Sequence, residues 1–140
     1  MIAALLALSA CGDAEPAPPA QPAATVRMAA VPGRPASGYF ELRIDGDRGA
    51  LVSVTSPQAG RIEMHETMNM ANMSTMRALG SIPVHDGETL RFAPGARHLM
   101  IYDLRRDVAA GQRVDLVFHF ARGGPVTLPA TVVAAGSEAQ

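Results

Sequence analysis

Apolar and polar residues alternate over several short stretches of the chain. Phe40, Leu42 and Ile44, for example, are each followed by a polar residue, which is the period of a strand with one buried face. The stretches of strand character are 26–31, 40–44, 51–56, 62–65, 90–92, 98–102, 114–120 and 126–133. None of them shows the 3.6-residue period of an amphipathic helix. The pattern therefore predicts an all-β domain.

Turn-forming residues separate these stretches. Asp45-Gly46-Asp47 follows one of them, Pro94-Gly95 follows another, and Gly123-Gly124-Pro125 precedes the last. Short strands with turn signals at this spacing are typical of two packed sheets. We therefore expect a Greek-key β-sandwich of about seven or eight short strands.

The alternation also assigns faces to particular side chains. His98 and Met100 are two residues apart, so on a strand both point to the same side. Leu99 and Ile101 then point to the core. His65 likewise points away from the apolar face of its own strand. If the two strands are neighbours, the polar faces of both come together.

These side chains belong to a longer pattern. His65 is followed by ten residues and Met76, then by twenty-one residues and His98-x-Met100. Imidazole binds several transition metals, whereas the soft, neutral thioether sulfur favours Cu(I). We therefore expect His65, Met76, His98 and Met100 to bind copper as Cu(I).

Three further methionines lie between the first two members of the pattern. Met68, Met70 and Met73 occupy a stretch rich in polar residues, which we interpret as a loop. Such methionines have no packing reason to accumulate there. They are candidates for a secondary copper site or for guarding the opening of the first site; the alternative is that they are idle loop residues.

Composition excludes several function classes. A chain of 140 residues with a formal net charge of −1 fits a single domain that does not bind nucleic acid. The one cysteine, Cys11, precedes the domain, so a blue-copper site with a thiolate ligand is excluded. We find no nucleophile–base pairing, and we expect neither an enzyme nor an oligomer.

The ends of the chain have a different character from the middle. Residues 1–10 are almost wholly apolar but too few to span a bilayer. Leu8-Ser9-Ala10-Cys11 resembles a lipoprotein cleavage box. We therefore predict a signal peptide at 1–10, a lipidated Cys11 with a Pro/Ala-rich linker over 11–24, a domain at 25–134 and a tail at 135–140. The domain would lie in the periplasm or on the outer face of the cell, held to the membrane by the lipid alone.

The spacing of the four candidate ligands resembles that of the PCu(A)C periplasmic copper chaperones. Residues 61–67, Ile82-Pro83 and Pro94-Gly95 also resemble segments of that family, and the similarity covers about 26–133. The resemblance implies a cupredoxin-like fold and Cu(I) bound by the four side chains. It also implies delivery of copper to a cytochrome c oxidase subunit or to another copper chaperone.

Two other functions remain open from the sequence. A copper-sequestering protein for metal tolerance would use the same site without a receiving protein. A metal-free structural or adhesive lipoprotein would use the sandwich alone.

Overall fold

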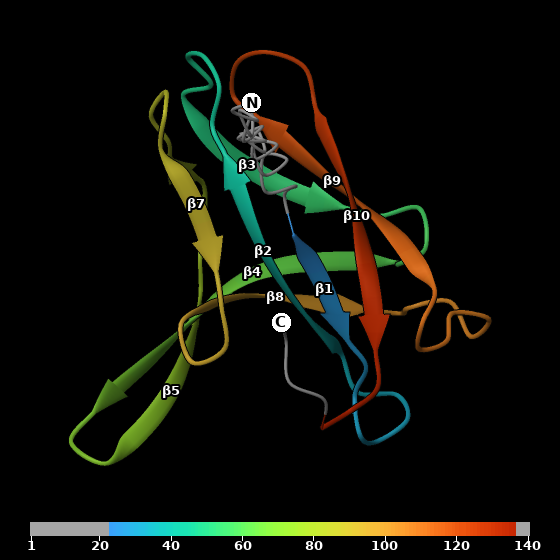
Figure 1. The fold of residues 1–140 in the computed structure, drawn as a ribbon. Coiled ribbons are helices and arrows are strands. Elements are labelled where there is room, and N and C mark those ends of the chain that lie inside the picture. The colour runs from blue at the N-terminus through green and yellow to red at the C-terminus, as the bar shows by residue number, and fades with distance from the viewer. Residues whose placement is uncertain (1–22, 137–140) are drawn as a thin grey trace, which may run out of the picture.

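The structure is a computed structural model that describes residues 23–136. Across this range the regular elements are all strands, which confirms the predicted fold class (Figure 1). They are β1 (Ala24–Arg27), β2 (Ala36–Arg43), β3 (Ala50–Thr55), β4 (Arg61–Met70), β5 (Met73–Ala78), β6 (Ile82–Pro83), β7 (Thr89–Phe92), β8 (Arg97–Tyr102), β9 (Arg113–Phe120) and β10 (Val126–Val133). Ten strands are thus present where about seven or eight were expected. No helix among residues 23–136 is both long enough and apolar enough to cross a membrane.

Some of the predicted features lie outside the described residues. These are the signal peptide over 1–10, Cys11, most of the linker and the last part of the tail. They remain predictions from the sequence.

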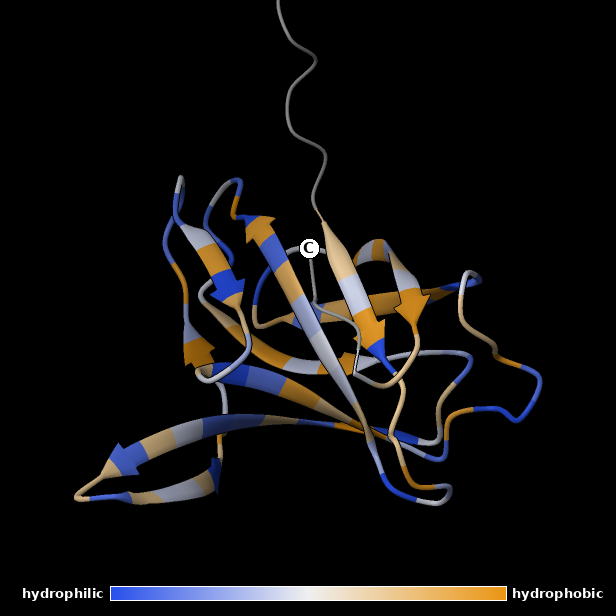
Figure 2. Cartoon of the chain, turned by 60° about the horizontal axis from the view of Figure 1, so that its bottom comes forward, coloured by the Kyte–Doolittle hydropathy of each residue, from blue (hydrophilic) through white to orange (hydrophobic). Residues whose placement is uncertain are grey.

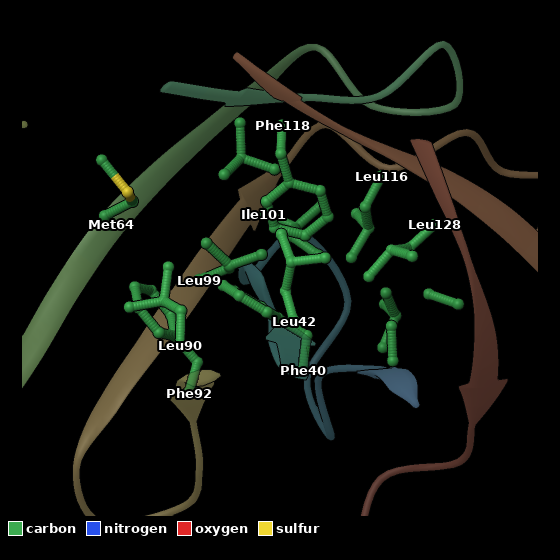
Figure 3. Close-up of a cluster of buried hydrophobic side chains, with 14 of the residues drawn as sticks. Phe40, Leu42, Met64, Leu90, Phe92, Leu99, Ile101, Leu116, Phe118 and Leu128 are labelled. Carbon is green, nitrogen blue, oxygen red and sulfur yellow. The ribbon is translucent and has the colours of Figure 1, made fainter. Parts of the chain in front are cut away.

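The strands form one continuous sheet that folds over on itself. Its order is β5-β4-β8-β2-β1-β10-β9-β3-β6, and β7 pairs with the second half of β2. Every pair is antiparallel except β1 with β10. The two halves pack face to face, as the ring centroids of Phe40 on β2 and Phe118 on β9 are 4.6 Å apart (Figure 3). The arrangement is the expected β-sandwich.

The core consists of the residues that the alternation assigned to it. Phe40, Leu42, Leu116 and Phe118 are all buried. Their polar neighbours along the same strands face outward, as in β2 and β9. Burial of large apolar side chains is the main stabilising contribution to such a fold, at roughly 1.5–3 kcal/mol each.

The core also fixes which way β8 faces. Leu99 is 0% exposed and Ile101 is 1% exposed, so both side chains are held inside the sandwich (Figure 3). Met64 on the neighbouring β4 is buried with them. Since side chains alternate along a strand, the residues between these anchors must point away from the core.

The strands β4 and β5 form a long hairpin that extends beyond the sandwich (Figures 1 and 2). It contains the stretch that we interpreted as a loop, and that interpretation is wrong. Met68 and Met70 lie in β4, and Met73 begins β5. The turn at Ala71-Asn72 has φ angles of 44° and 69°, which is the left-handed geometry that tight two-residue hairpins require.

Candidate metal centre

The two candidate histidines face each other across adjacent strands. His65 on β4 is directly opposite His98 on β8. The centroids of the two rings are 5.9 Å apart, and the ring planes are inclined by 32°. The sequence prediction required these strands to be neighbours, and they are.

The two candidate methionines lie on the same face as the histidines. Met100 follows His98 by two residues on β8 and is opposite Glu63. Met76 on β5 is opposite Thr67, which lies two residues beyond His65 on β4. Met76 is 63% exposed, whereas Met100 is half-buried. Both thioethers are therefore diagonal neighbours of His65, at a separation that a long side chain can bridge.

His98 has a defined tautomer. Its side chain is buried, and Nδ1 lies 3.2 Å from the carbonyl oxygen of Ala96. Since a carbonyl oxygen can only accept, Nδ1 carries the proton and Nε2 keeps a free lone pair. The same oxygen accepts a bond from the backbone nitrogen of Thr67, so the turn before β8 is tied to β4 beside the site.

His65 has the opposite tautomer. Its Nε2 lies 2.9 Å from Oε2 of Glu63. An ionised carboxylate can only accept, so Nε2 carries the hydrogen and donates this bond. Nδ1 is left buried without a hydrogen-bond partner. A buried polar atom without a protein partner is rare in folded proteins, and binding of an ion or water is one of its explanations. The orphaned lone pair of His65 is therefore available to a metal.

A chain of contacts holds Glu63 and the site in position. Arg61 binds Glu63 through an ion pair of 3.0 Å, and its guanidinium lies 4.2 Å from the ring centroid of Tyr102. The Tyr102 hydroxyl is 4.0 Å from the sulfur of Met100. The hydrogen bond from His65, together with the charge of Arg61, holds the pKa of Glu63 below its usual value. Glu63 thus stays ionised and orients the His65 ring.

The three other methionines are not part of this arrangement. Met68 and Met70 alternate with Thr67 on β4, and Met73 is directly opposite Met70. All three therefore point to the face of the hairpin that is opposite to His65 and Met76. One interpretation of the sequence was that they guard the opening of the first site. Their position on the opposite face does not fit that interpretation.

The remaining histidines also lie elsewhere. Nε2 of His119 on β9 is 2.8 Å from the hydroxyl of Thr55. His85 is exposed in the turn before β7. Neither is brought to the site.

The supporting residues Glu63, Arg61 and Tyr102 were not recognised as functional from the sequence. Glu63 and Tyr102 are each two residues from a candidate ligand, so the alternation already placed them on the correct face. Their pairing with His65 and Met100 depends on side-chain geometry that the sequence does not contain.

The donor set of the site is soft and neutral. Among residues 23–136, no three His, Cys, Asp or Glu side chains lie close enough together to hold a metal. Two free imidazole lone pairs and two thioether sulfurs share one face instead. Neutral sulfur and imidazole donors suit Cu(I) better than a hard cation such as Mg²⁺ or Ca²⁺.

Comparison with known proteins shows similarity to proteins described as lipoproteins. A family model described as "Putative lipoprotein LpqE-like" matches residues 20–132. The chain is 33% identical over 82 residues to a protein of Leifsonia xyli subsp. xyli described as "Putative lipoprotein Lxx21020". The match covers 56% of this chain and 49% of that protein, so the chain spans about half the length of this relative.

Solved structures share the fold. The PCuAC domain of PmoF2, solved without copper, superimposes with a TM-score of 0.66 at 19% identity, covering 84% of this chain and 91% of that domain. The Cu(I) form of DR1885 from Deinococcus radiodurans gives a TM-score of 0.57 at 23% identity, covering 81% of this chain and 76% of the other. The expected resemblance to PCu(A)C proteins is confirmed for the fold.

Proposed function

Because the chain belongs to the LpqE-like lipoprotein family, we propose that it is an exported copper chaperone. It binds one Cu(I) ion through His65, Met76, His98 and Met100. The observation that best supports this function is the histidine pair, in which the ring centroids are 5.9 Å apart, Nδ1 of His65 is buried without a partner, and the hydrogen bond of His98 Nδ1 leaves its Nε2 free. The Cu(I) form of DR1885, which has the same fold, supports the choice of metal.

The ligands differ in exposure, and this gives binding and release an order. His98 is 8% exposed and Met76 is 63% exposed. Met76 is thus the ligand that a receiving protein reaches first. Because the ligands are neutral, they can be exchanged one at a time. No exchange step leaves a buried side chain with an unpaired charge, which would be unfavourable in free energy. His98, fixed by the Ala96 carbonyl, releases the ion last.

The copper would pass to a receiving protein outside the cytoplasm. We propose a cytochrome c oxidase subunit or another copper chaperone in that role, and a monomeric chaperone. A lipidated Cys11 would hold the domain at the membrane, on the periplasmic or outer face of the cell, and the lipoprotein description of the family supports such an anchor. Thioether ligands suit an oxidising compartment because they cannot form disulfides.

The binding function is tested by titrating Cu(I) anaerobically against a chromophoric chelator. Wild-type protein should take copper from the chelator at one strong site. His98→Ala should lose this site, whereas the matched control His85→Ala, which changes an exposed histidine in a turn, should keep it. Strong binding retained in His98→Ala would refute the site, and no binding by the wild-type protein would leave a metal-free structural lipoprotein.

Delivery needs a separate experiment in cells. A strain that lacks the protein should lose cytochrome c oxidase activity under copper limitation and recover it when copper is added. Wild-type protein should restore the activity, and His98→Ala should not. Normal oxidase activity together with sensitivity to excess copper would indicate sequestration for tolerance instead.

A further inference from the structure

The β4–β5 hairpin carries two separate groups of methionines on its two faces. Its register runs from His65 opposite Ala78 to Met70 opposite Met73. His65 and Met76 occupy one face. The other face carries Met68, Met70 and Met73, here called the methionine triad.

The triad is compact in the plane of the hairpin. Met70 and Met73 are directly opposite each other, and Met68 is two residues from Met70 on the same strand. Directly opposite side chains have Cβ atoms about 4.5–5.5 Å apart, and diagonal neighbours lie about 7–8 Å apart. The unbranched methionine side chain has three rotatable bonds. Three sulfur atoms can therefore converge on one point above this face.

The triad has no packing role in the sandwich. Met70 is 66% exposed and Met73 is 68% exposed, while Met68 is half-buried. The hairpin projects beyond the sandwich, so its outer part lies away from the core (Figure 2). Large apolar side chains that stay in contact with water do not stabilise the fold. Packing therefore does not explain why methionine occurs at these three positions.

The charged neighbours of the triad are already paired. Glu66 is on the same face of β4, and its carboxylate binds Arg77 at 2.8 Å and Arg97 at 3.8 Å. That carboxylate is therefore not free to serve as a hard ligand. What the face offers is three neutral thioethers, a donor set that selects Cu(I) over Zn²⁺ and over hard cations.

We propose that the methionine triad is a second Cu(I) site, in which Met68, Met70 and Met73 hold one ion through three sulfur atoms. This site does not share a ligand with the first, so it goes beyond the proposed function. It lacks imidazole and has one ligand fewer, and it lies in contact with solvent. It is therefore weaker than the first site and fills after it.

The test follows Cu(I) binding to the full chain labelled with ¹³C at the methionine methyl groups, under anaerobic conditions. The first equivalent should shift the signals of Met76 and Met100, and the second should shift those of Met68, Met70 and Met73. The triple variant Met68→Leu, Met70→Leu, Met73→Leu keeps side chains of similar size without sulfur. It should bind one ion where wild type binds two.

The quadruple variant His65→Ala, Met76→Leu, His98→Ala, Met100→Leu is the reciprocal control, because it removes every ligand of the first site. It should still bind one ion, with only sulfur neighbours in X-ray absorption. That result would support the second site even if wild type failed to bind copper through its histidines. Equal copper stoichiometry in wild type and the triple leucine variant would overturn the proposal. Unchanged triad signals at the second equivalent would overturn it as well, and would leave the exposed methionines as a surface for protein contact.

Discussion

His65 and His98 lie opposite each other with ring centroids 5.9 Å apart, and a different nitrogen atom of each ring is engaged in a hydrogen bond. Glu63 binds Nε2 of His65, and the Ala96 carbonyl binds Nδ1 of His98. Each ring therefore has its free lone pair fixed by a hydrogen bond on its other nitrogen, as is usual for metal-binding histidines. Glu63 and the Ala96 carbonyl thus fix the orientation of the two rings.

Replacing Glu63 should weaken copper binding without removing a ligand. In Glu63→Ala the His65 ring loses the partner that fixes its tautomer and orientation. Loss of such an outer partner costs about 10–100-fold in metal affinity. Competition with a Cu(I) chelator measures the change. Glu41→Ala is the matched control, since Glu41 pairs with Arg91 in a similar exposed ion pair on β2. Equal affinities for the two variants would show that Glu63 has no positioning role.

The contribution of Glu63 to the stability of the copper-free protein should be present near neutral pH and disappear at low pH. The hydrogen bond from His65 and the charge of Arg61 lower the pKa of Glu63 from its usual 4.5. A lowered pKa in the folded state means that the contribution is complete above the unfolded value and disappears as the pH falls through the folded value. The difference in unfolding free energy between wild type and Glu63→Ala should therefore be constant near neutral pH and shrink in acid. Urea unfolding over a pH series measures it, and a difference that grows in acid would contradict the assignment.

Copper affinity should fall as the solution becomes acidic. Imidazole must be unprotonated to bind a metal, and free imidazole takes up a proton near pH ~6.5. Thioethers do not titrate, so part of the binding should persist. Chelator competition at pH ~7.5 and ~5 makes the comparison. Constant affinity over this range would argue against two histidine ligands.

Leu99, the core residue between His98 and Met100 on β8, should contribute to the stability of the fold. Leu99 is fully buried between His98 and Met100. Leu99→Ala should lower the free energy of unfolding by about 2–5 kcal/mol because it leaves a cavity. Met70→Ala, on the exposed hairpin, should stay within about 0.5 kcal/mol of wild type. Urea unfolding of the copper-free proteins compares them, and similar losses would mean that Leu99 does not anchor β8.

The sequence predicted the strands that have one buried face. Leu99 and Ile101, for instance, alternate with His98 and Met100 because one set packs in the core and the other does not. The alternation also indicated that the side chains of the candidate ligands point away from the core. It did not determine which strands are neighbours, because pairing depends on contacts between residues that are distant along the chain.

The prediction from the sequence was wrong for strands that do not have one buried and one exposed face. Both faces of the outer hairpin are exposed or half-buried, so the alternation of Met68, Asn69 and Met70 does not correspond to one buried and one exposed face. We therefore took a hairpin for a loop. The strand β6 has only two residues, one of them Pro83, and it is too short for any period to be visible.

The central claim is that two imidazoles and two thioethers bind the same Cu(I) ion. X-ray absorption on the full chain loaded with one equivalent of Cu(I) tests it most directly, because it counts the neighbours of the metal. We expect two nitrogen and two sulfur neighbours, with one sulfur lost in Met76→Leu. A spectrum without sulfur neighbours, or one that is unchanged in Met76→Leu, would contradict the account.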